Sequence, residues 1–300
     1  MTKILITGAN GLLGQKLVQL YADDSNTQVI ATGKGADRNR SGSHLYEQMN
    51  ITSPDEVMGI IKKHQPDFVI NTAAMTHVDE CELNPEACWK LNVDAVSYLI
   101  DACKATNSFL IHLSTDFIFD GENGPYTEED SPNPLSKYAV SKLESEKLLQ
   151  ASGLPSAIVR TMLVYGIVHD MSRSNIILWV KKSLEEKKHI KVINDQWRTP
   201  TLAEDLAKGC ALIAEKRAEG VFNISGKELL TPYDMAVATA DFFQLDKSYI
   251  EEVDGSIFTQ PARRPAKTGF ILDKARSVLG YEPVSFEEGL TTLRDQLAHV

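Results

Sequence analysis

Three observations predict an α/β fold with a doubly wound parallel sheet and a smaller α/β lobe at the C-terminal end. The chain begins with an apolar run over residues 4–6, which glycines interrupt before it continues at helical spacing. Strand and helix signals then alternate as far as residue 165. The helical segments are long enough to be the crossovers that parallel strands require. Ligands are therefore expected at the carboxyl ends of the strands.

The expected elements of the first part follow one another without a gap. Strands are expected over residues 3–7, 28–32, 68–71, 109–113 and 157–164, and helices over 15–20, from 54, from 85 to 103 and over 138–150. The helix at residue 54 has a clear start signal, because Ser53 can cap it and Pro54 fits its first turn.

The turn after the first strand predicts a phosphate site. Gly8 and Gly11 let the backbone approach a pyrophosphate, and Gly14 lets the helix pack against the strand. The N-terminus of that helix presents free N–H groups to an anion. The spacing is G-x-x-G-x-x-G and not the commoner G-x-G-x-x-G. A glycine turn that binds no ligand is the alternative for this motif alone.

The pattern changes after residue 165, which predicts a dinucleotide-binding domain over residues 1–165 and a substrate lobe over 166–300. Helices are expected over 175–188, 203–217 and 232–243, and strands over 190–193 and 221–224. No linker rich in Pro, Gly or Ser separates the parts. Residues from about 200 to 225 are therefore expected to pack back on the first domain.

Composition excludes several classes of protein. The 300 residues are 43% hydrophobic and 24% charged, and the net charge of −10 argues against general binding to nucleic acid or anionic membrane. No apolar run approaches a membrane span, and no signal segment opens the chain. Neither the four cysteines nor the histidines have metal-ligand spacing, so we expect no metal. These features predict a cytoplasmic protein.

The loop after the second strand predicts which cofactor is preferred. An Asp or Glu at this position would bind the 2′-hydroxyl of NAD(H), and none is present. Lys34, Arg38 and Arg40 stand there instead, beside the expected position of a 2′-phosphate. We therefore expect NADP(H) to be preferred, with NAD(H) as the alternative cofactor. A solvated basic loop is the other interpretation.

Two motifs predict carbonyl reduction. Ser114 and Thr115 end a strand, so their hydroxyls are expected at the cofactor edge of the sheet. Tyr138 and Lys142 lie four residues apart on a helix and share one face. A lysine charge would stabilise the phenolate, so that Tyr138 could donate a proton to an alkoxide while Thr115 bonds the carbonyl oxygen. A Tyr-x-x-x-Lys pattern also arises by chance.

Taken together, the motifs resemble those of the extended short-chain dehydrogenases/reductases, which have a Rossmann-like fold. The closer resemblance is to the dTDP-4-dehydrorhamnose reductase family, carried by the segments 76–82, 194–201, 205–207 and 262–265 together with the STDFIFDG run and the Tyr138/Lys142 pair. It covers nearly the whole chain. It implies an NADP(H)-dependent oxidoreductase that converts dTDP-4-dehydrorhamnose to dTDP-L-rhamnose, with Thr115, Tyr138 and Lys142 as the catalytic set.

The resemblance also implies two groups of binding residues. The cofactor group is Gly8, Asn10, Gly11, Leu12, Leu13, Gly14, Lys34, Arg38, Asn50, Ile51, Thr72, Ala73, Ala74, Asn92, Tyr138, Lys142 and Thr161. The substrate group is Thr76, Val78, Asp79, Leu163, Trp197, Arg198 and Arg263. Arg263 and Arg264 form either a diphosphate clamp or ordinary surface charge. A homodimer is compatible with the resemblance.

Two departures leave other functions open. The reductases usually have an aromatic residue where this chain has Leu163, and glycine where it has Arg198. A different ligand, or a Trp197 ring that replaces the missing one, would account for these changes. Similar passages are found in the regulatory β subunit of methionine adenosyltransferase, which binds the cofactor and a partner enzyme. A nucleotide-sugar epimerase is the third alternative.

Overall fold

The computed structural model describes residues 1–298 apart from residues 23, 41 and 172–173. Its centre is a parallel sheet of seven strands in the order β10-β6-β5-β4-β1-β2-β3. The order reverses beside β1, which is the mark of a doubly wound sheet. The strands are β1 (Thr2–Thr7), β2 (Thr27–Gly33), β3 (His44–Gln48), β4 (Phe68–Asn71), β5 (Phe109–Thr115), β6 (Ser156–Thr161) and β10 (Gly220–Asn223).

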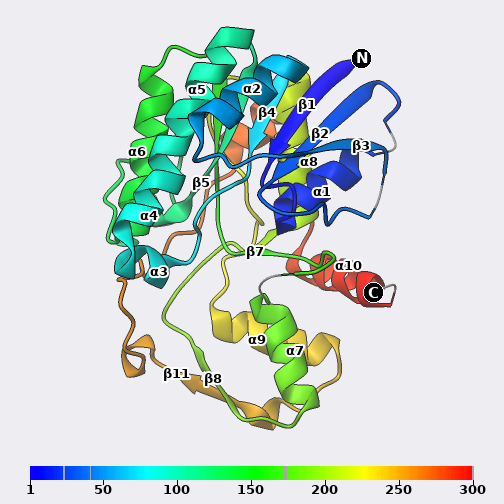
Figure 1. Cartoon of the computed structure of the whole chain (residues 1–300). Coiled ribbons are helices and arrows are strands. Elements are labelled where there is room, and N and C mark those ends of the chain that lie inside the picture. The colour runs from blue at the N-terminus through cyan, green and yellow to red at the C-terminus, as the bar shows by residue number, and fades with distance from the viewer. Residues whose placement is uncertain (23, 41, 172–173, 299–300) are drawn as a thin grey trace.

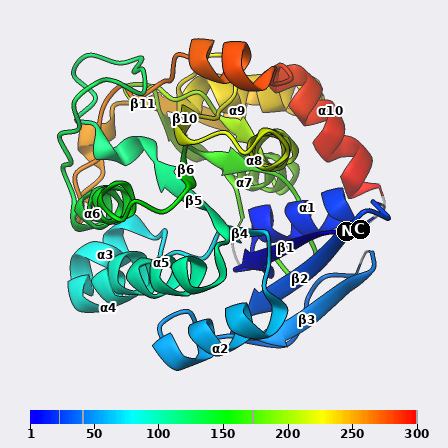
Figure 2. The same cartoon turned by 90° about the horizontal axis from the view of Figure 1, so that it is seen from above.

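Helices cover both faces of the sheet, as Figure 2 shows from above. One face carries α2 (Pro54–His64), α3 (Val78–Leu83), α4 (Pro85–Trp89), α5 (Ala95–Thr106) and α6 (Lys137–Ala151). The other face carries α1 (Leu12–Tyr21) and α8 (Ala203–Lys216), and α10 (Phe286–Leu297) lies beside them. The predicted Rossmann-like α/β fold is therefore confirmed, with an apolar core on each side of the sheet.

A smaller lobe hangs below the sheet in Figure 1. It holds α7 (Ile176–Glu185), α9 (Pro232–Phe242) and the parallel pair β8 (Ile190–Ile193) and β11 (Ile250–Val253) around its own apolar core. The chain passes between the two parts several times, because α8 and β10 belong to the large sheet although they follow β8 in sequence. The short pair β7 (Val164–Tyr165) and β9 (Thr201–Leu202) lies at the junction.

Two expected elements are broken in the structure. The helix expected from residue 85 to 103 is three segments, because a π-helix over Lys90–Asp94 separates α4 from α5. The strand expected over 157–164 ends at Thr161, and Leu163 takes a left-handed backbone with φ of 38° before β7 begins. Such interruptions cluster at functional sites. The sequence analysis did not predict β3, α3, β11 or α10.

The glycine turn between β1 and α1 is built by close backbone approach. Gly8 has φ of 64°, and a Cβ there would lie 2.9 Å from the backbone of Ala73. A Cβ on Gly14 would lie only 2.3 Å from the carbonyl oxygen of Gly8. Both positions therefore require glycine, which leaves the backbone of this turn open to a ligand.

The close approach predicts that Gly14→Ala destabilises the fold. The added methyl group meets backbone atoms that cannot rotate away, so we expect the free energy of unfolding to fall by about 1–3 kcal/mol or more in urea denaturation. Gly35→Ala is the matched control, because no atom lies within 4 Å of its added Cβ. Its stability should stay within about 0.5 kcal/mol of the wild type. Equal stability of the two variants would show that the turn can relax.

Candidate active site

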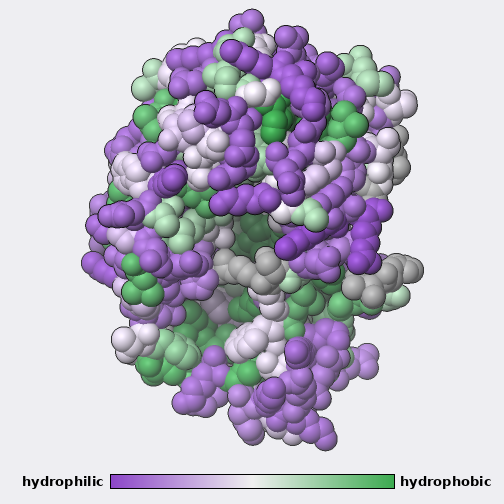
Figure 3. Space-filling view, in the orientation of Figure 1, coloured by the Kyte–Doolittle hydropathy of each residue, from purple (hydrophilic) through white to green (hydrophobic). Residues whose placement is uncertain are grey.

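The predicted site residues converge on one edge of the large sheet. Because the strands are parallel and adjacent, the segments that follow them share this edge. It carries Gly8 after β1, Lys34 after β2, Asn50 and Ile51 after β3, Thr72, Ala73 and Ala74 after β4, Thr115 at the end of β5 and Thr161 at the end of β6. Figure 3 shows the surface hollowed between this edge and the smaller lobe.

Thr115 and Tyr138 meet in a buried part of this edge. Thr115 ends β5, and Tyr138 lies in the first turn of α6. The hydroxyl of Thr115 donates to Asp116 Oδ1 at 3.2 Å and accepts from the backbone N–H of Phe117. Burial raises the pKa of Tyr138 well above its ordinary value, and the nearby hydroxyl of Thr115 acts in the opposite direction. The phenol therefore keeps its proton at neutral pH, as a proton donor must.

Lys142 lies one helical turn after Tyr138, but its charged group has other partners. Its Nζ donates to the carbonyl oxygen of Leu113 at 2.6 Å and lies 3.2 Å from Nε2 of His112. Burial lowers the pKa of Lys142 to about 8. The effect of the Lys142 charge on the pKa of Tyr138 stays a prediction; among the neighbours that act on that pKa, Thr115 is the one that lowers it.

Asp116, the residue after Thr115, forms a buried ion pair with Arg198. Arg198 Nε lies 3.5 Å from Asp116 Oδ2, and Thr268 donates to the same carboxylate oxygen. The other nitrogens of Arg198 donate to the carbonyls of Trp197, Pro265 and Ala266. Burial raises the pKa of Asp116 and lowers that of Arg198, so desolvation opposes the charged pair.

These contacts revise the expected role of Arg198. It is 5% exposed, and its donors are engaged by the protein, so it is not placed to bind a substrate directly. Its guanidinium lies 5.6 Å from the ring of Phe117, whose edge meets the ring of Tyr138 at 6.1 Å. Arg198 therefore positions the catalytic turn, and does so from the part of the chain that borders the substrate lobe.

The two arginines of the 262–265 loop have different environments. Arg264 pairs with Asp79 of α3 at 2.7 Å, and its hydrogen bonds hold the pKa of that carboxyl below the usual range. The predicted substrate residue Asp79 is thus engaged in joining the loop to α3. Arg263 is exposed, and no hydrogen bond or ion pair from the described residues involves it. A clamp made of both arginines would require Arg264 to leave Asp79.

Two of the expected cofactor residues make hydrogen bonds within the protein. Asn10 donates to the carbonyl of Ala36 and accepts from the backbone of Arg38, so it fixes the basic loop. Asn92, in the π-helix, exchanges two hydrogen bonds with the backbone of Met75 and donates to Ser141 of α6. Both side chains are engaged by protein groups, so any cofactor contact would share them with these bonds.

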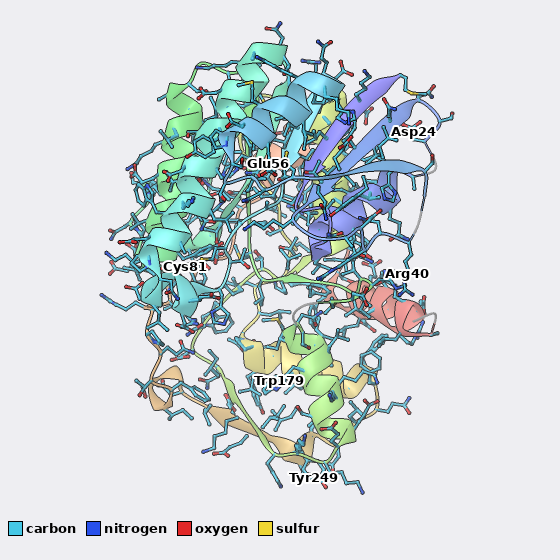
Figure 4. The ribbon with its side chains drawn as sticks, in the orientation of Figure 1. Asp24, Arg40, Glu56, Cys81, Trp179 and Tyr249 are labelled. Carbon is cyan, nitrogen blue, oxygen red and sulfur yellow. The ribbon has the colours of Figure 1, made fainter. Side chains whose placement is uncertain are left out.

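The remaining geometry fits a dinucleotide. The glycine turn offers open backbone at the N-terminus of α1, and the buried hydroxyl of Ser114, at the same edge, has no hydrogen-bond partner among the described residues. Lys34 and Arg38 are exposed in the loop after β2. A cavity of about 440 Å³ adjoins this loop, lined by Gln15, Asn39, Arg40, His169 and Gln296 among others. Arg40 lies beside α10 in Figure 4.

The substrate side of the hollow has an apolar component. Leu163 and Trp197 are large apolar side chains that remain 40% and 39% exposed. Val78 is half-buried in the first turn of α3, and Thr76 precedes it. Among the described residues no cluster of three or more His, Cys, Asp or Glu side chains could hold a metal ion, and no helix is long and apolar enough to cross a membrane.

Sequence reasoning missed the buried polar groups behind the site. The histidines were considered only as metal ligands, and His112 lies against Lys142. Asp116 belongs to the quoted STDFIFDG run but was given no role. The available signal was a histidine and an aspartate inside an otherwise apolar strand and turn, where buried charge needs a partner.

Comparison with known proteins gives the family. The family described as "RmlD substrate binding domain" matches residues 1–299. The dTDP-4-dehydrorhamnose reductase of Aggregatibacter actinomycetemcomitans is 30% identical over 98% of this chain and 99% of its own. The methionine adenosyltransferase 2 subunit beta of Bos taurus is 37% identical over 85% of this chain and 76% of its own.

Solved structures agree with this family. A dTDP-4-dehydrorhamnose reductase from Clostridium acetobutylicum has a TM-score of 0.88 at 28% identity, covering 99% of this chain and 100% of its own. The reductase from Bacillus anthracis, solved in complex with NADP, has a TM-score of 0.86 at 23% identity and covers 99% of each chain. At that identity the second likeness concerns the fold.

The buried pair predicts a large effect of Arg198→Met on stability. Removing the guanidinium leaves Asp116 buried and unpaired, so the free energy of unfolding should fall by about 3–5 kcal/mol in chemical denaturation. Asp116→Asn introduced together with Arg198→Met should recover part of this loss, because no charge then lacks a partner. Arg263→Met is the exposed control, expected within about 0.5 kcal/mol of the wild type. Equal effects of the two arginine variants would contradict the pair's role.

Proposed function

Because this chain belongs to the RmlD substrate-binding domain family, we propose that it is an NAD(P)H-dependent reductase of a nucleotide-linked 4-keto sugar. The substrate we propose is dTDP-4-dehydrorhamnose, and the product dTDP-L-rhamnose. The observation that carries the proposal is the buried placement of Tyr138 beside Thr115, whose hydroxyl lowers the pKa of the phenol, at the edge of the sheet that also holds the open glycine turn.

The chemistry follows from the placement of these residues. The nicotinamide supplies the hydride when it is bound. Tyr138 donates its proton to the oxygen of the reduced carbonyl, and its raised pKa keeps that proton available at neutral pH. Thr115 can donate a hydrogen bond to the same oxygen. Lys142, with a pKa of about 8, can lose and regain a proton near neutral pH. The proton that it loses can restore the phenol of Tyr138.

The substrate residues separate into apolar and charged contacts. We propose that Leu163 and Trp197, both partly exposed, pack against the sugar or the base. Arg263 is the exposed cation that would meet the diphosphate, and Thr76, Val78 and Asp79 are the proposed contacts on the neighbouring segment. The bonds of Ala262 and Arg264 to Asp79 hold the loop of Arg263 against α3.

The basic loop supports NADP(H) as the preferred cofactor. Lys34 and Arg38 are exposed at the end of β2, and Arg38 donates to the carbonyl of Asp170 across the site. NAD(H) lacks the phosphate that these side chains would contact and is the weaker ligand. The cytoplasmic location and the homodimer stay predictions.

A regulatory subunit is the second candidate function. The observation that favours it is the 37% identity to a methionine adenosyltransferase β subunit, which exceeds the identity to the curated reductase. In that case the site binds cofactor but reduces no sugar. Oxidation of NADPH by the wild type with a panel of nucleotide 4-keto sugars separates the two. An epimerase would convert nucleotide sugars without net oxidation of NADPH.

Tyr138→Phe should lower turnover on the order of a hundredfold or more, because it removes the proton donor and leaves the ring in place. Affinity for NADPH, measured by fluorescence titration, should remain near that of the wild type. Turnover equal to that of the wild type would remove Tyr138 from the mechanism.

Replacing Lys34 and Arg38 by alanine should weaken NADPH much more than NADH. A lost charge-assisted bond to the 2′-phosphate is expected to cost roughly tenfold or more in affinity, while NADH has no such bond to lose. Dissociation constants for both cofactors give the comparison. Equal weakening of both would identify the cluster as a solvated loop.

A further inference from the structure

The charged group of Lys142 is enclosed by polar atoms that the proposed mechanism does not use. His112 is 1% exposed, and burial together with Lys142 holds its pKa well below the ordinary value. The ring is therefore neutral and carries one proton, on either Nδ1 or Nε2. Because Nε2 lies 3.2 Å from Lys142 Nζ, the choice decides what Lys142 meets.

The neighbours of Nδ1 determine this choice. Asn71 Nδ2 lies 3.0 Å from His112 Nδ1, and Thr7 Oγ1 donates to Asn71 Oδ1 at 2.6 Å. The Thr7 hydroxyl also accepts from the backbone N–H of Ala73. A rotated Asn71 amide would turn its NH₂ group toward Thr7 and leave the threonine proton without an acceptor among the described residues. The amide therefore donates to Nδ1, and the ring proton is on Nε2.

We infer that Thr7, Asn71 and His112 are positioning residues that set the tautomer of the His112 ring and, through it, the protonation and direction of Lys142. Ser145 gives its own proton to the carbonyl of Lys142 at 2.7 Å, so its oxygen accepts from His112 Nε2 at 3.0 Å. Lys142 thus faces the N–H of His112 Nε2. In the other tautomer, Nε2 would carry a lone pair that could accept a hydrogen bond from Lys142. This inference rests on the proposed function of Lys142.

An ammonium group on Lys142 therefore gains no hydrogen bond from His112. Among the described residues, the acceptor that remains for its protons is the carbonyl of Leu113. A neutral amine, by contrast, can turn its lone pair toward the ring N–H, which Ser145 also accepts. The relay formed by Thr7, Asn71 and His112 therefore favours loss of a proton from Lys142. This suits a residue that returns a proton to Tyr138.

The other ionisable groups near Lys142 do not reproduce this effect. Cys88 of α4 and Glu146 of α6 both raise its pKa, and Glu146 is itself paired with Arg160 of β6 at 2.8 Å. Asp116 after β5 and Cys81 of α3 act on Tyr138, one turn of α6 away. Figure 4 shows Cys81 in the helical layer that holds α3 and α4.

The tautomer can be observed without any turnover. Protein labelled with ¹⁵N-histidine, with His112 assigned by the loss of its signals in His112→Gln, should show an unprotonated Nδ1 and a protonated Nε2 at neutral pH. A protonated Nδ1 would overturn the inference. Because this readout needs no substrate, it stands even where the reductase proposal fails and no nucleotide sugar is reduced.

Two variants test the link to Lys142. Asn71→Asp places an acceptor at Nδ1, so the ring proton should move there, and the titration midpoint of ¹³C-labelled Lys142 should rise by about one unit or more. Thr7→Val adds no charge and frees the Asn71 amide to rotate, so it should shift tautomer and midpoint in the same direction by less. Ser145→Ala is the matched control, because it alters the Nε2 side alone and should leave the proton on Nε2.

Each pattern of results decides the question. A raised midpoint in Asn71→Asp with both tautomer and midpoint unchanged in Thr7→Val would reduce the effect to the added carboxylate and overturn the relay. A changed tautomer with an unchanged midpoint would show that the tautomer of His112 does not control the protonation of Lys142, and would overturn the inference. Where Asn71→Asp does not fold, Thr7→Val carries the test alone. In the active enzyme, the basic limb of the pH profile of kcat should move with the midpoint.

Discussion

The buried pair of Asp116 and Arg198 connects the two parts of the chain at the catalytic turn. Asp116 follows Thr115 directly, and Arg198 belongs to the segment that leads from the smaller lobe back to the large sheet. The bonds of Arg198 to the carbonyls of residues 265 and 266 fix the loop that carries Arg263. The position of Thr115, the proposed catalytic threonine, and that of the expected diphosphate contact Arg263 thus depend on one guanidinium.

Desolvation makes this arrangement costly, and hydrogen bonds offset that cost. An isolated buried carboxylate would take up a proton, but Asp116 receives bonds from Thr115 and Thr268 as well as the charge of Arg198. The second buried pair, Glu146 and Arg160, joins α6 to β6 in the same way. The helix that carries Tyr138 and Lys142 is therefore held from behind by charge and not only by apolar packing.

Most of the fold could be predicted from the sequence, because apolar runs and glycines have local meaning. The strand-turn-helix at residues 2–21 is an example, since the close approach at Gly14 leaves no room for a side chain. The edge strand β3 could not be predicted, because its side chains are half exposed and form no apolar run. The π-helix at Asn92 was also hidden, because its cause is a long-range bond to Met75.

The site was predictable to the extent that strand ends define it. Thr115, Tyr138 and Lys142 could be named from the positions of β5 and α6, whereas the partners of Lys142 could not. His112 and Asn71 are 41 residues apart, and only the pairing of β4 with β5 brings them together. For the same reason Arg198 was assigned to the substrate, because no local signal shows that distant carbonyls engage it.

The backbone at Leu163 links this connectivity to ligand choice. After Thr161 the chain must leave the large sheet and pair with β9, and the hydroxyl of Thr201 bonds to the carbonyl of Met162 at this bend. A left-handed conformation costs a leucine roughly 1–2 kcal/mol, a strain that glycine would avoid. Position 163 nevertheless carries a leucine, whose side chain is 40% exposed. The bond of Thr201 to Met162 holds the path of the chain at this bend, so an exchange of the Leu163 side chain would change the exposed surface and not the path.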